Sequence, residues 1–482
     1  MQVIFEKSFS GRRGSSFPSS DVDVKGDIPA PYRRQEDTGL PQVSELDVVR
    51  HYTRLSQMNF SVDSQFYPLG SCTMKYNPKF TEVAAGLKGF SELHPLLPQL
   101  PQGEKLAQGA LDILYQMDHL LSEITGMDAF TLQPLAGAHG ELTGAMIIAA
   151  YHKAKGNRKK HIIIPDTAHG TNPSSATIAG YETITVPSDQ NGVMDLRQLK
   201  EKITNKTAGL MLTCPNTLGL FNPAIKEICQ MVHDVDGVTY YDGANLNAIL
   251  GRCRPGDIGF DIVHVNLHKT FATPHGGGGP GAGPVGVVHK LEKFLPISRV
   301  IKKNDGSYAL KYDFPDSIGY IASFYGNFSV IVKAYAYISL LGREGLLQTS
   351  DHAVLNANYM KVMLQEDYAM LSDHFCMHEF VCSASRQMAQ GVHAIDIAKF
   401  LIDKGFHPPT VYFPLTVKEA IMIEPTETES KQSMDQFIQA MQEAARLAQE
   451  NPGFFHKFPQ NMPIHRPDEV KAAREARVNY FA

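Results

Sequence analysis

The sequence has no tryptophan, no long hydrophobic run and no large excess of charge of one sign. It carries 45 lysines and arginines against 50 aspartates and glutamates, a net charge of −5 in 482 residues. The densest basic run, residues 158–160, is too short to form a nucleic-acid-binding surface, so we expect no nucleic-acid partner. No stretch reaches the roughly 18 apolar residues of a membrane span, and residues 1–20 lack the apolar core of an export signal. We therefore expect a soluble, cytoplasmic protein.

Cysteine is also scarce, and its pattern excludes two kinds of scaffold. The six cysteines form no CxxC pair, which argues against both a disulfide framework and a structural zinc site. We expect no metal. Cys72, in the segment 70–73, is placed like a nucleophile, but the sequence assigns it no base. We interpret Cys72 as a structural or cleft-lining residue.

The length allows about three compact units at roughly 150 residues per domain. Residues 1 to about 60 are rich in serine, glycine, proline and charge, which is typical of an extended arm. We expect an arm with a small-domain segment (1–85), a large domain (86–330) and a smaller C-terminal α+β domain (331–482).

Short β-branched runs alternate with helical patterns in the large domain. The expected strands are 161–164, 183–186, 209–212, 238–241, 262–265 and 285–288, and the clearest helical patterns are 104–125, 223–232, 328–341 and 434–447. A further strand is expected at 420–423. Strands that alternate with helices pair in parallel through crossovers, so we predict a doubly wound, mostly parallel α/β sheet.

In such a sheet, ligands lie at the carboxyl ends of the strands. The residues that follow the predicted strands are Pro165, Asp166, His169, Thr213, Asn216, Asp242, Ala244, Asn245, His268, Lys269 and Thr270. These residue types suit pyridoxal phosphate (PLP), which needs a lysine for a Schiff base, a carboxylate for its ring nitrogen and backbone amides for its phosphate. Gly137 and Ala138, just before the helical run 142–151, are candidates for the phosphate cradle, since small residues and a helix N-terminus favour anions.

Each of these residues also has a structural interpretation. In that interpretation Asp242 simply ends a strand, His169 is a satisfied polar histidine, and His268 only packs. Lys269 has apolar, glycine-rich or aromatic neighbours, which disfavours an exposed face. A lysine in such surroundings can have a lowered pKa, which helps it to exchange Schiff bases.

Several long motifs then carry a resemblance to a known family. They are 67–75 (YPLGSCTMK), 132–141 (LQPLAGAHGE), 168–173 (AHGTNP), 266–271 (NLHKTF) with the glycine-rich run 276–283, and 423–427 (IEPTE). With them, nearly the whole chain after about residue 40 resembles glycine dehydrogenase (decarboxylating), the P-protein of the glycine cleavage system. The similarity is to its lysine-bearing C-terminal half, which many bacteria make as a separate subunit 2.

The resemblance implies the fold type I, aspartate-aminotransferase-like arrangement of PLP enzymes. Lys269 would be the Schiff-base lysine, Asp242 would pair with the ring nitrogen, and His169 would stack on the ring. The segment 136–141, with Gly137 and Ala138, would hold the phosphate. The remaining expected cofactor contacts are Thr213, Ala244 and His268.

The implied activity is PLP-dependent decarboxylation of glycine, with transfer of the aminomethyl group to the lipoyl group of the H-protein and release of CO2. The implied enzyme is an oxidoreductase that needs a homologous subunit 1, in an α2β2 assembly. Alternatives are another fold type I enzyme, such as an amino-acid decarboxylase, an aminotransferase or a cysteine desulfurase, or a non-catalytic assembly subunit. An aminotransferase would need a carboxylate-binding arginine, for which Arg386 is a candidate.

Overall fold

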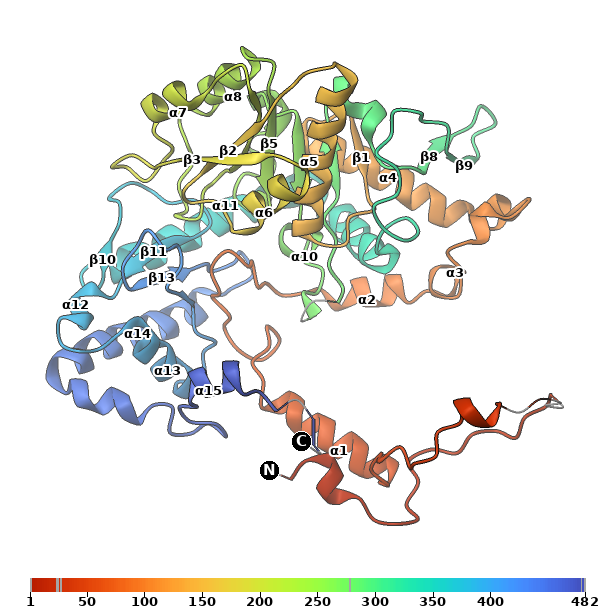
Figure 1. Ribbon diagram of the computed structural model, residues 1–482. Coiled ribbons are helices and arrows are strands. Elements are labelled where there is room, and N and C mark those ends of the chain that lie inside the picture. Colours follow the sequence, from red (N-terminus) through yellow and green to blue (C-terminus); the bar gives the residue numbers. More distant parts are fainter. Residues whose placement is uncertain (1, 23–25, 27, 277–278, 478, 481–482) are drawn as a thin grey trace. The chain divides into compact units, whose positions relative to one another are not determined.

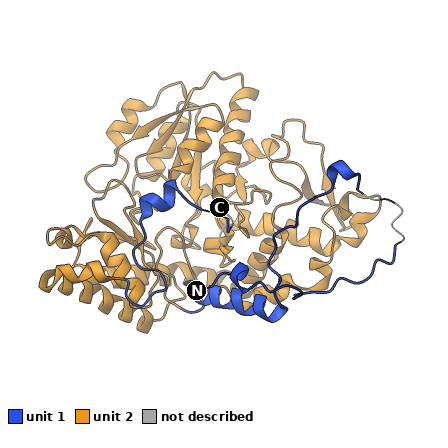
Figure 2. Ribbon diagram, turned by 60° about the horizontal axis from the view of Figure 1, so that its bottom comes forward, with its two compact units in different colours: residues 1–64, 459–482 blue, residues 65–458 orange. Residues whose placement is uncertain are grey.

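The computed structural model describes residues 2–22, 26, 28–276, 279–477 and 479–480, and the chain forms two compact units (Figure 2). Unit 1 comprises residues 1–64 with 459–482, and unit 2 comprises residues 65–458. This division is made by contacts and does not follow the three expected segments, whose boundaries remain a prediction.

The elements are labelled in Figure 1. The α-helices are α1 (Glu45–Gln57), α2 (Lys79–Ala85), α3 (Lys88–Ser91), α4 (Gln108–Thr125), α5 (Gly137–Ala154), α6 (Thr171–Ile178), α7 (Leu196–Lys202), α8 (Ile225–His233), α9 (Pro255–Ile258), α10 (Leu267–Thr270), α11 (Phe328–Leu364), α12 (Ser385–Met388), α13 (Ala394–Asp403), α14 (Lys431–Glu450) and α15 (Glu469–Arg474). The strands are β1 (Ala129–Thr131), β2 (His161–Pro165), β3 (Glu182–Val186), β4 (Thr207–Thr213), β5 (Val238–Gly243), β6 (Ile262–Val265), β7 (Val285–Val287), β8 (Arg299–Lys302), β9 (Tyr308–Lys311), β10 (Ala369–Met370), β11 (Phe380–Ser383), β12 (Thr410–Val411) and β13 (Ala420–Ile423). Short 3₁₀ helices are η1 (Ile4–Lys7), η2 (Ala30–Tyr32), η3 (Leu97–Gln99), η4 (Gly103–Leu106), η5 (Leu246–Ala248), η7 (His289–Phe294) and η8 (Pro452–Lys457).

Unit 1 contains a helix where the sequence predicted only an extended arm. The hydroxyl oxygen of Ser44 accepts a hydrogen bond from the backbone N–H of Asp47, which caps the start of α1. The rings of Phe5 and Tyr480 stack with their centroids 4.7 Å apart. Only His51 of α1 is buried, so most of this helix is exposed.

Unit 2 is built on a seven-stranded sheet in the order β1-β7-β6-β5-β4-β2-β3. The pairs from β6 to β3 are parallel, and β7 pairs antiparallel with both β6 and β1. The six strands expected from the β-branched runs are confirmed as β2 to β7. The predicted class, a mostly parallel α/β sheet, is therefore correct.

Helices cover both faces of this sheet, and α5 lies across one of them (Figure 1). Side chains alternate between the faces because successive residues of a strand point to opposite sides. Thus Tyr240 packs in the cluster that contains Ile147 and Ile148 of α5, whereas Tyr241 packs with residues of α4, α8 and α11. Both tyrosine rings are fully buried, and burial of such large side chains stabilises the fold by about 1.5–3 kcal/mol each.

A smaller antiparallel sheet, in the order β10-β11-β13-β12, carries α13 and α14. The expected strand 420–423 is confirmed as β13, and the expected helix 434–447 lies within α14. The register pairs Phe380 of β11 with Ile423 of β13. The residues just outside this pair, Glu379 and Glu424, consequently lie at the same end of the sheet.

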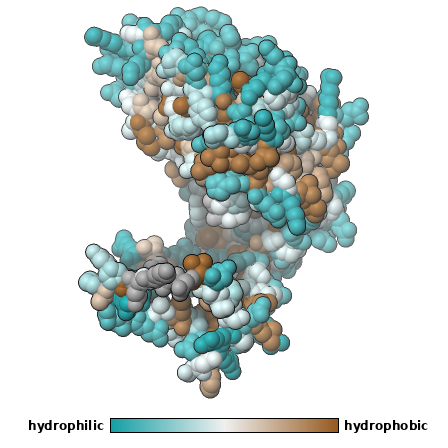
Figure 3. Space-filling model, turned by 90° about the vertical axis from the view of Figure 1, so that its right-hand side faces the viewer, coloured by the Kyte–Doolittle hydropathy of each residue, from teal (hydrophilic) through white to brown (hydrophobic). Residues whose placement is uncertain are grey.

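The surface of unit 2 carries exposed hydrophobic side chains. Val83, Leu87, Leu100 and Leu106 are each more than half exposed. On the face drawn in Figure 3, hydrophobic side chains gather into separate patches among hydrophilic ones. Within the described part of the chain, no helix has both the length and the hydropathy to cross a membrane.

Candidate active site

The carboxyl ends of the central strands bring several predicted residues together. Thr213, at the end of β4, is the registered neighbour of Asp242 on β5, and Asp242 is in turn opposite His264 on β6. The chain leaves β6 and enters the short helix α10, which carries His268 and Lys269. The site therefore lies at the edge of the sheet where parallel α/β proteins bind ligands.

Asp242 is a buried carboxylate surrounded by donors. One oxygen accepts from Asn172 Nδ2 at 3.0 Å and from Thr213 Oγ1 at 3.3 Å, and the other accepts from the Ala244 N–H at 3.1 Å. Burial raises the pKa of Asp242, but His264, these hydrogen bonds and the charge of Lys269 together hold it below its ordinary value. Asp242 is therefore ionised at neutral pH.

His264 is a site residue that the sequence did not reveal, because it lies inside a predicted strand. Tyr240 Oη lies 2.6 Å from His264 Nδ1, and His264 Nε2 lies 3.5 Å from Asp242 Oδ1. Burial lowers the pKa of His264, which favours a neutral ring. We assign the Tyr240 hydroxyl as the donor to Nδ1, which leaves the Nε2–H facing Asp242.

Lys269 is half-buried, and its amine is hydrogen-bonded within the site. Nζ donates to the carbonyl oxygen of Ser71 at 2.6 Å. The charge of Lys269 lowers the pKa of Asp242 and also opposes the raised pKa of Glu141, so the amine lies within electrostatic reach of both carboxyl groups. Asp242 and Lys269 thus lie at the same edge of the sheet, at the ends of the adjacent strands β5 and β6.

The loop that offers the Ser71 carbonyl is clamped by the two acids at the end of the small sheet. Ser71 N–H donates to Glu379 at 2.6 Å, and Thr73 donates to Glu424 from its N–H at 3.0 Å and its hydroxyl at 2.5 Å. Ser71 and Thr73 have φ values of 62° and 46°, a conformation that costs a non-glycine residue about 1–3 kcal/mol. Burial and the neighbouring acid raise the pKa of Glu379, and burial raises that of Glu424.

His378 completes a cluster with these acids, since one ligand atom from each of the three residues lies within 4.8 Å of the others. Three of the four carboxylate oxygens already accept hydrogen bonds from the loop. We therefore assign Glu379 and Glu424 as a clamp on the loop. The motif at 423–427 signalled Glu424, whereas no sequence signal pointed to Glu379, whose position depends on pairing across the small sheet.

The start of α5 provides an open anion cradle beside Lys269. No side chain caps the helix at Ala136, so its first N–H groups are available. A Cβ added to Gly137 would lie 2.7 Å from the side-chain oxygen of Asn266, the residue three before Lys269. That buried Asn266 oxygen meets no hydrogen-bond partner among the described residues. Gly137 is thus packed against Asn266, the residue that precedes α10.

The glycine-rich run after Lys269 packs against this cradle. A Cβ on Gly283 would lie 2.2 Å from the Ala136 carbonyl oxygen, and one on Gly281 would lie 2.7 Å from that of Leu135. Glycine is needed at both positions because the two backbones approach so closely. Residues 277–278 of the run lie outside the described residues.

The two other predicted histidines differ in their surroundings. His169 is exposed, and its Nδ1 lies 2.7 Å from Thr171 Oγ1. His268 accepts from the Ala282 N–H at 3.5 Å and lies edge-on to His275. Burial lowers the pKa of His268 to about 3, so it is neutral and acts only as a hydrogen-bonding or packing group.

Cys72 and Arg386, which the sequence analysis also considered, show no feature of a catalytic or substrate-binding residue in their contacts with the described residues. Cys72 is half-buried, and burial raises the pKa of its thiol, which agrees with its interpretation as a cleft-lining residue. Arg386 is exposed on α12, where its guanidinium donates to the carbonyl oxygens of Glu366 at 2.5 Å and Gln365 at 3.5 Å. Its contacts are therefore with the backbone just after α11.

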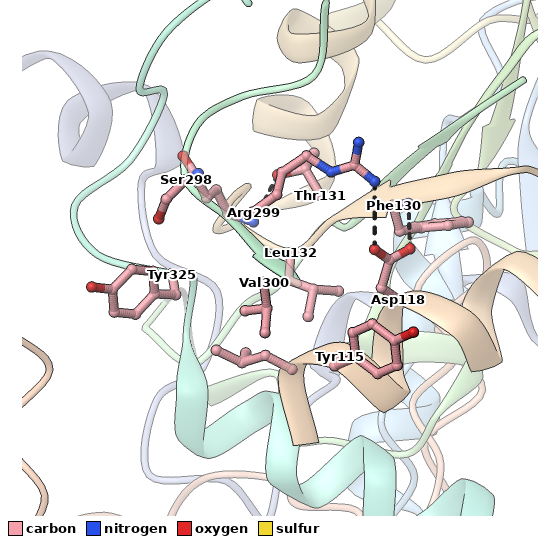
Figure 4. A pocket seen from close by; sticks show the side chains of 11 residues that line it. Tyr115, Asp118, Phe130, Thr131, Leu132, Ser298, Arg299, Val300 and Tyr325 are labelled. Atoms are coloured by element: carbon pink, nitrogen blue, oxygen red, sulfur yellow. Dashed lines mark hydrogen bonds and ion pairs between the residues drawn. The ribbon is translucent and has the colours of Figure 1, made fainter. Parts of the chain in front are cut away.

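A cavity between α4, β1 and β8 lies apart from the candidate site and does not include the predicted site residues (Figure 4). Asp118 accepts from the Phe130 N–H at 2.7 Å and lies 3.9 Å from Arg299. The cavity volume is about 40 Å³, which suits one or two water molecules and is too small for an amino-acid substrate.

Lys75 supports the site from below α10. Its side chain is buried, and its Nζ donates to Glu427 at 2.6 Å, to the Thr270 carbonyl at 2.8 Å and to Tyr337 Oη at 3.4 Å. Burial lowers the pKa of Lys75, but Glu427 and Tyr337 outweigh this effect and raise it overall. The charged side chain of Lys75 therefore links its own segment to α10 by hydrogen bonding.

We expect Lys75→Met to lower the free energy of unfolding by about 3–5 kcal/mol, because it leaves the Glu427 carboxylate buried without its counter-charge. Urea denaturation of the whole chain measures the change. The matched control is Lys303→Met, which removes an exposed ion pair with Glu104 and should cost less than about 1 kcal/mol. Equal effects of the two substitutions would contradict the role of Lys75.

Taken together, a lysine and an ionised carboxylate at adjacent strand ends, beside an uncapped helix start, define a PLP-dependent enzyme of fold type I. The fold agrees with solved structures. The chain aligns with a glycine decarboxylase (P-protein) of the glycine cleavage system with a TM-score of 0.69 at 16% identity, covering 88% of this chain and 92% of that one. It aligns with the glutamate decarboxylase of Lactobacillus brevis with a TM-score of 0.66 at 13% identity, covering 88% and 96%.

The sequence comparisons identify the family. Residues 28–311 match the model of the glycine cleavage system P-protein, and residues 349–452 match that of the glycine dehydrogenase C-terminal domain. Relatives named "Probable glycine dehydrogenase (decarboxylating) subunit 2" are 54% identical in Caldanaerobacter subterraneus (99% of this chain, 98% of the relative) and in Bacillus velezensis (99% and 97%). The chain belongs to the glycine cleavage system P-protein family.

Proposed function

We propose that this chain is the lysine-bearing subunit of a P-protein, which decarboxylates glycine with PLP and transfers the aminomethyl group to the lipoyl group of an H-protein. The observation that carries the proposal is the placement of Lys269 and ionised Asp242 at adjacent strand ends, in a chain 54% identical to proteins named for this activity. Family membership supplies the substrate, and the site geometry supplies the chemistry.

The residues present fit PLP. Lys269 would hold the aldehyde carbon as a Schiff base, Gly137 and Ala138 would hold the phosphate at the start of α5, and His169 would lie on the ring. Asp242 would meet the ring nitrogen, with Thr213, Ala244 and His268 as further contacts. When bound, PLP withdraws electrons from the bond between the carboxylate of an attached amino acid and its α-carbon.

Asp242 has the central electrostatic role. Its carboxylate is kept ionised by Asn172, Ala244 and His264, so it holds a proton on a ring nitrogen placed against it. Water is excluded from the carboxylate, which is only 3% exposed, and an ion pair in such surroundings is stronger than in water.

The Ser71 carbonyl has a complementary role toward Lys269. It accepts the amine at 2.6 Å, which orients the side chain whenever the lysine is not covalently engaged. Glu379 and Glu424 fix this carbonyl because they hold the strained loop on both sides of Cys72. The clamp thus keeps the lysine within the site.

Two alternatives are less well supported. An aminotransferase needs an arginine for the substrate carboxylate, and Arg386 is instead engaged by backbone carbonyls. A non-catalytic assembly subunit would have no use for a buried ionised carboxylate beside a lysine, since burial of a charge is costly.

The partners follow from the family. We propose a cytoplasmic assembly with a homologous subunit 1, in the form α2β2, that receives lipoylated H-protein. Exposed hydrophobic residues such as Val83, Leu87 and Leu106 support a further subunit on unit 2, because surfaces of this kind are common at interfaces. The division into segments 1–85, 86–330 and 331–482 remains part of this proposal.

The test is the exchange of labelled bicarbonate into the carboxyl group of glycine, with PLP, lipoylated H-protein and a subunit 1 chain. We expect exchange that depends on all three additions. Exchange that fails with every subunit 1 tried, while another amino acid is decarboxylated or transaminated, would overturn the proposal.

A further inference from the structure

Glu141 is a buried acid that the proposed function leaves without a role. It lies in the first turns of α5 and is only 4% exposed. One carboxyl oxygen, Oε1, lies 2.8 Å from the Thr171 hydroxyl, and Oε2 meets no hydrogen-bond partner among the described residues. A buried carboxylate with one bare oxygen is costly when ionised.

The titratable groups around Glu141 come from three neighbouring elements. Asp242 and Tyr240 lie on β5, His264 on β6 and Lys269 on α10. Burial and then the negative charge of Asp242 raise the pKa of Glu141 to about 8, while Thr171 and Lys269 oppose the change more weakly. Because this pKa lies above 7, Glu141 carries a proton at neutral pH.

Thr171 joins Glu141 to His169. Its Oγ1 lies 2.8 Å from Glu141 Oε1 and 2.7 Å from His169 Nδ1, and its backbone N–H donates to the same Nδ1 at 3.3 Å. A hydroxyl has one hydrogen, so Thr171 donates to either Glu141 or His169 and accepts from the other. The direction of these two hydrogen bonds therefore depends on whether Glu141 or His169 Nδ1 carries the proton.

We propose that Glu141 is a positioning residue that acts through the Thr171 hydroxyl to select the tautomer of His169. Protonated Glu141 donates to Thr171, and Thr171 donates to His169 Nδ1, so the imidazole proton is on Nε2. The Thr171 N–H, which also donates to Nδ1, agrees with this arrangement. Ionised Glu141 instead accepts from Thr171, and the imidazole proton moves to Nδ1.

The consequence is a proton-dependent change at the exposed edge of His169. Below about pH 8, His169 carries the proton on Nε2, which is then a donor, and above it Nε2 becomes an acceptor. The effect of this change on catalysis rests on the proposed function, because the proposed function places His169 on the ring of the cofactor. The tautomer change itself depends only on the three side chains.

The experiment is nitrogen-15 NMR of the whole, cofactor-free chain labelled at histidine, with His169→Gln used to assign the His169 signals. In the wild-type chain we expect the proton of the His169 ring to move from Nε2 to Nδ1 as the pH rises, with a midpoint near pH 8. The chemical shifts of the two ring nitrogens should change in one step at this pH. A neutral imidazole alone shows no such step, because its two tautomers bear the same charge. Failure to observe the step would overturn the proposal.

Variants test whether the NMR step depends on the hydrogen-bonded relay from Glu141 through Thr171 to His169. Glu141→Gln stays neutral at all pH values, so the step should vanish. Thr171→Val should also abolish it, whereas Thr171→Ser, which retains the hydroxyl, should restore it. A step that persists in Glu141→Gln or in Thr171→Val would refute the relay.

The complete enzyme, with PLP, H-protein and subunit 1, tests the functional part separately. We expect kcat/KM for glycine to fall above pH 8 in the wild type and in Thr171→Ser, and this fall to move to higher pH in Glu141→Gln. If the NMR step is present but the pH profile is the same in all variants, the use of the His169 tautomer in catalysis is refuted while the relay stands. Absence of glycine activity in every variant, wild type included, would count against the proposed function alone.

Discussion

Replacing Lys269 with alanine is expected to lower glycine–bicarbonate exchange by about a thousandfold or more, because no other group at the site can hold the cofactor covalently. The residue lies on α10, directly after the central strand β6, and its amine reaches the Ser71 carbonyl at 2.6 Å. Its charge acts on Asp242 and on Glu141. The exchange assay with added PLP, H-protein and subunit 1 measures the loss.

Lys303→Ala is the matched control, since this exposed lysine pairs with Glu104. It should keep nearly all of the wild-type rate. Lys269→Ala that retains more than a tenth of the wild-type rate would show that the chemistry uses another lysine.

Asp242→Asn is expected to reduce the same rate by about 100- to 10,000-fold. An amide has no negative charge to hold a proton on the ring nitrogen, so the cofactor loses its strength as an electron sink. The side chain keeps its size and one oxygen, which can still accept from the Ala244 N–H, while the amide nitrogen takes the place of the oxygen that faces Thr213. The loss should therefore appear in kcat, with a smaller change in the amount of PLP bound.

Asp261→Asn distinguishes this effect from the general cost of altering a buried acid. Asp261 precedes β6, at the opposite edge of the sheet, and is held by His233 and Lys290. Its substitution should lower stability and leave kcat within about twofold of wild type. A comparable loss of kcat in both variants would indicate that Asp242 acts only through folding.

Local patterns predicted the large sheet well. The runs that form β2 to β7 are rich in β-branched residues, and all of these strands except the edge strand β3 are almost entirely buried, so hydrophobicity was a strong signal. The predicted end of the helix at residue 125 is correct, and Gly126 follows it in the left-handed conformation, at φ 74°, which is typical of a glycine that ends a helix. The predicted start at 104 was four residues early because 103–106 forms a 3₁₀ turn.

The helix predicted at 328–341 shows where local patterns lose information. It continues to Leu364 across a kink at Gly342, whose φ of 58° and ψ of −170° are not helical. Glycine indicates a stop, but only packing decides whether a second helix follows directly.

The sequence analysis selected candidate site residues because they follow a predicted strand. Asp242 and Lys269 were found in this way. His264 lies within a strand, and Glu379 reaches the site only because β11 pairs with β13. The relation of Glu141 to Thr171 and His169 depends on the packing of α5 against α6, which no spacing in the sequence encodes.

The most direct test of the central claim is to locate the cofactor on the chain. Borohydride converts a Schiff base between lysine and PLP into a stable secondary amine, and peptide mass analysis then identifies the modified lysine. The account predicts that the label lies on the peptide containing Lys269 and is lost in Lys269→Ala. Label on another lysine, such as buried Lys75, or none at all in protein saturated with PLP, would contradict it.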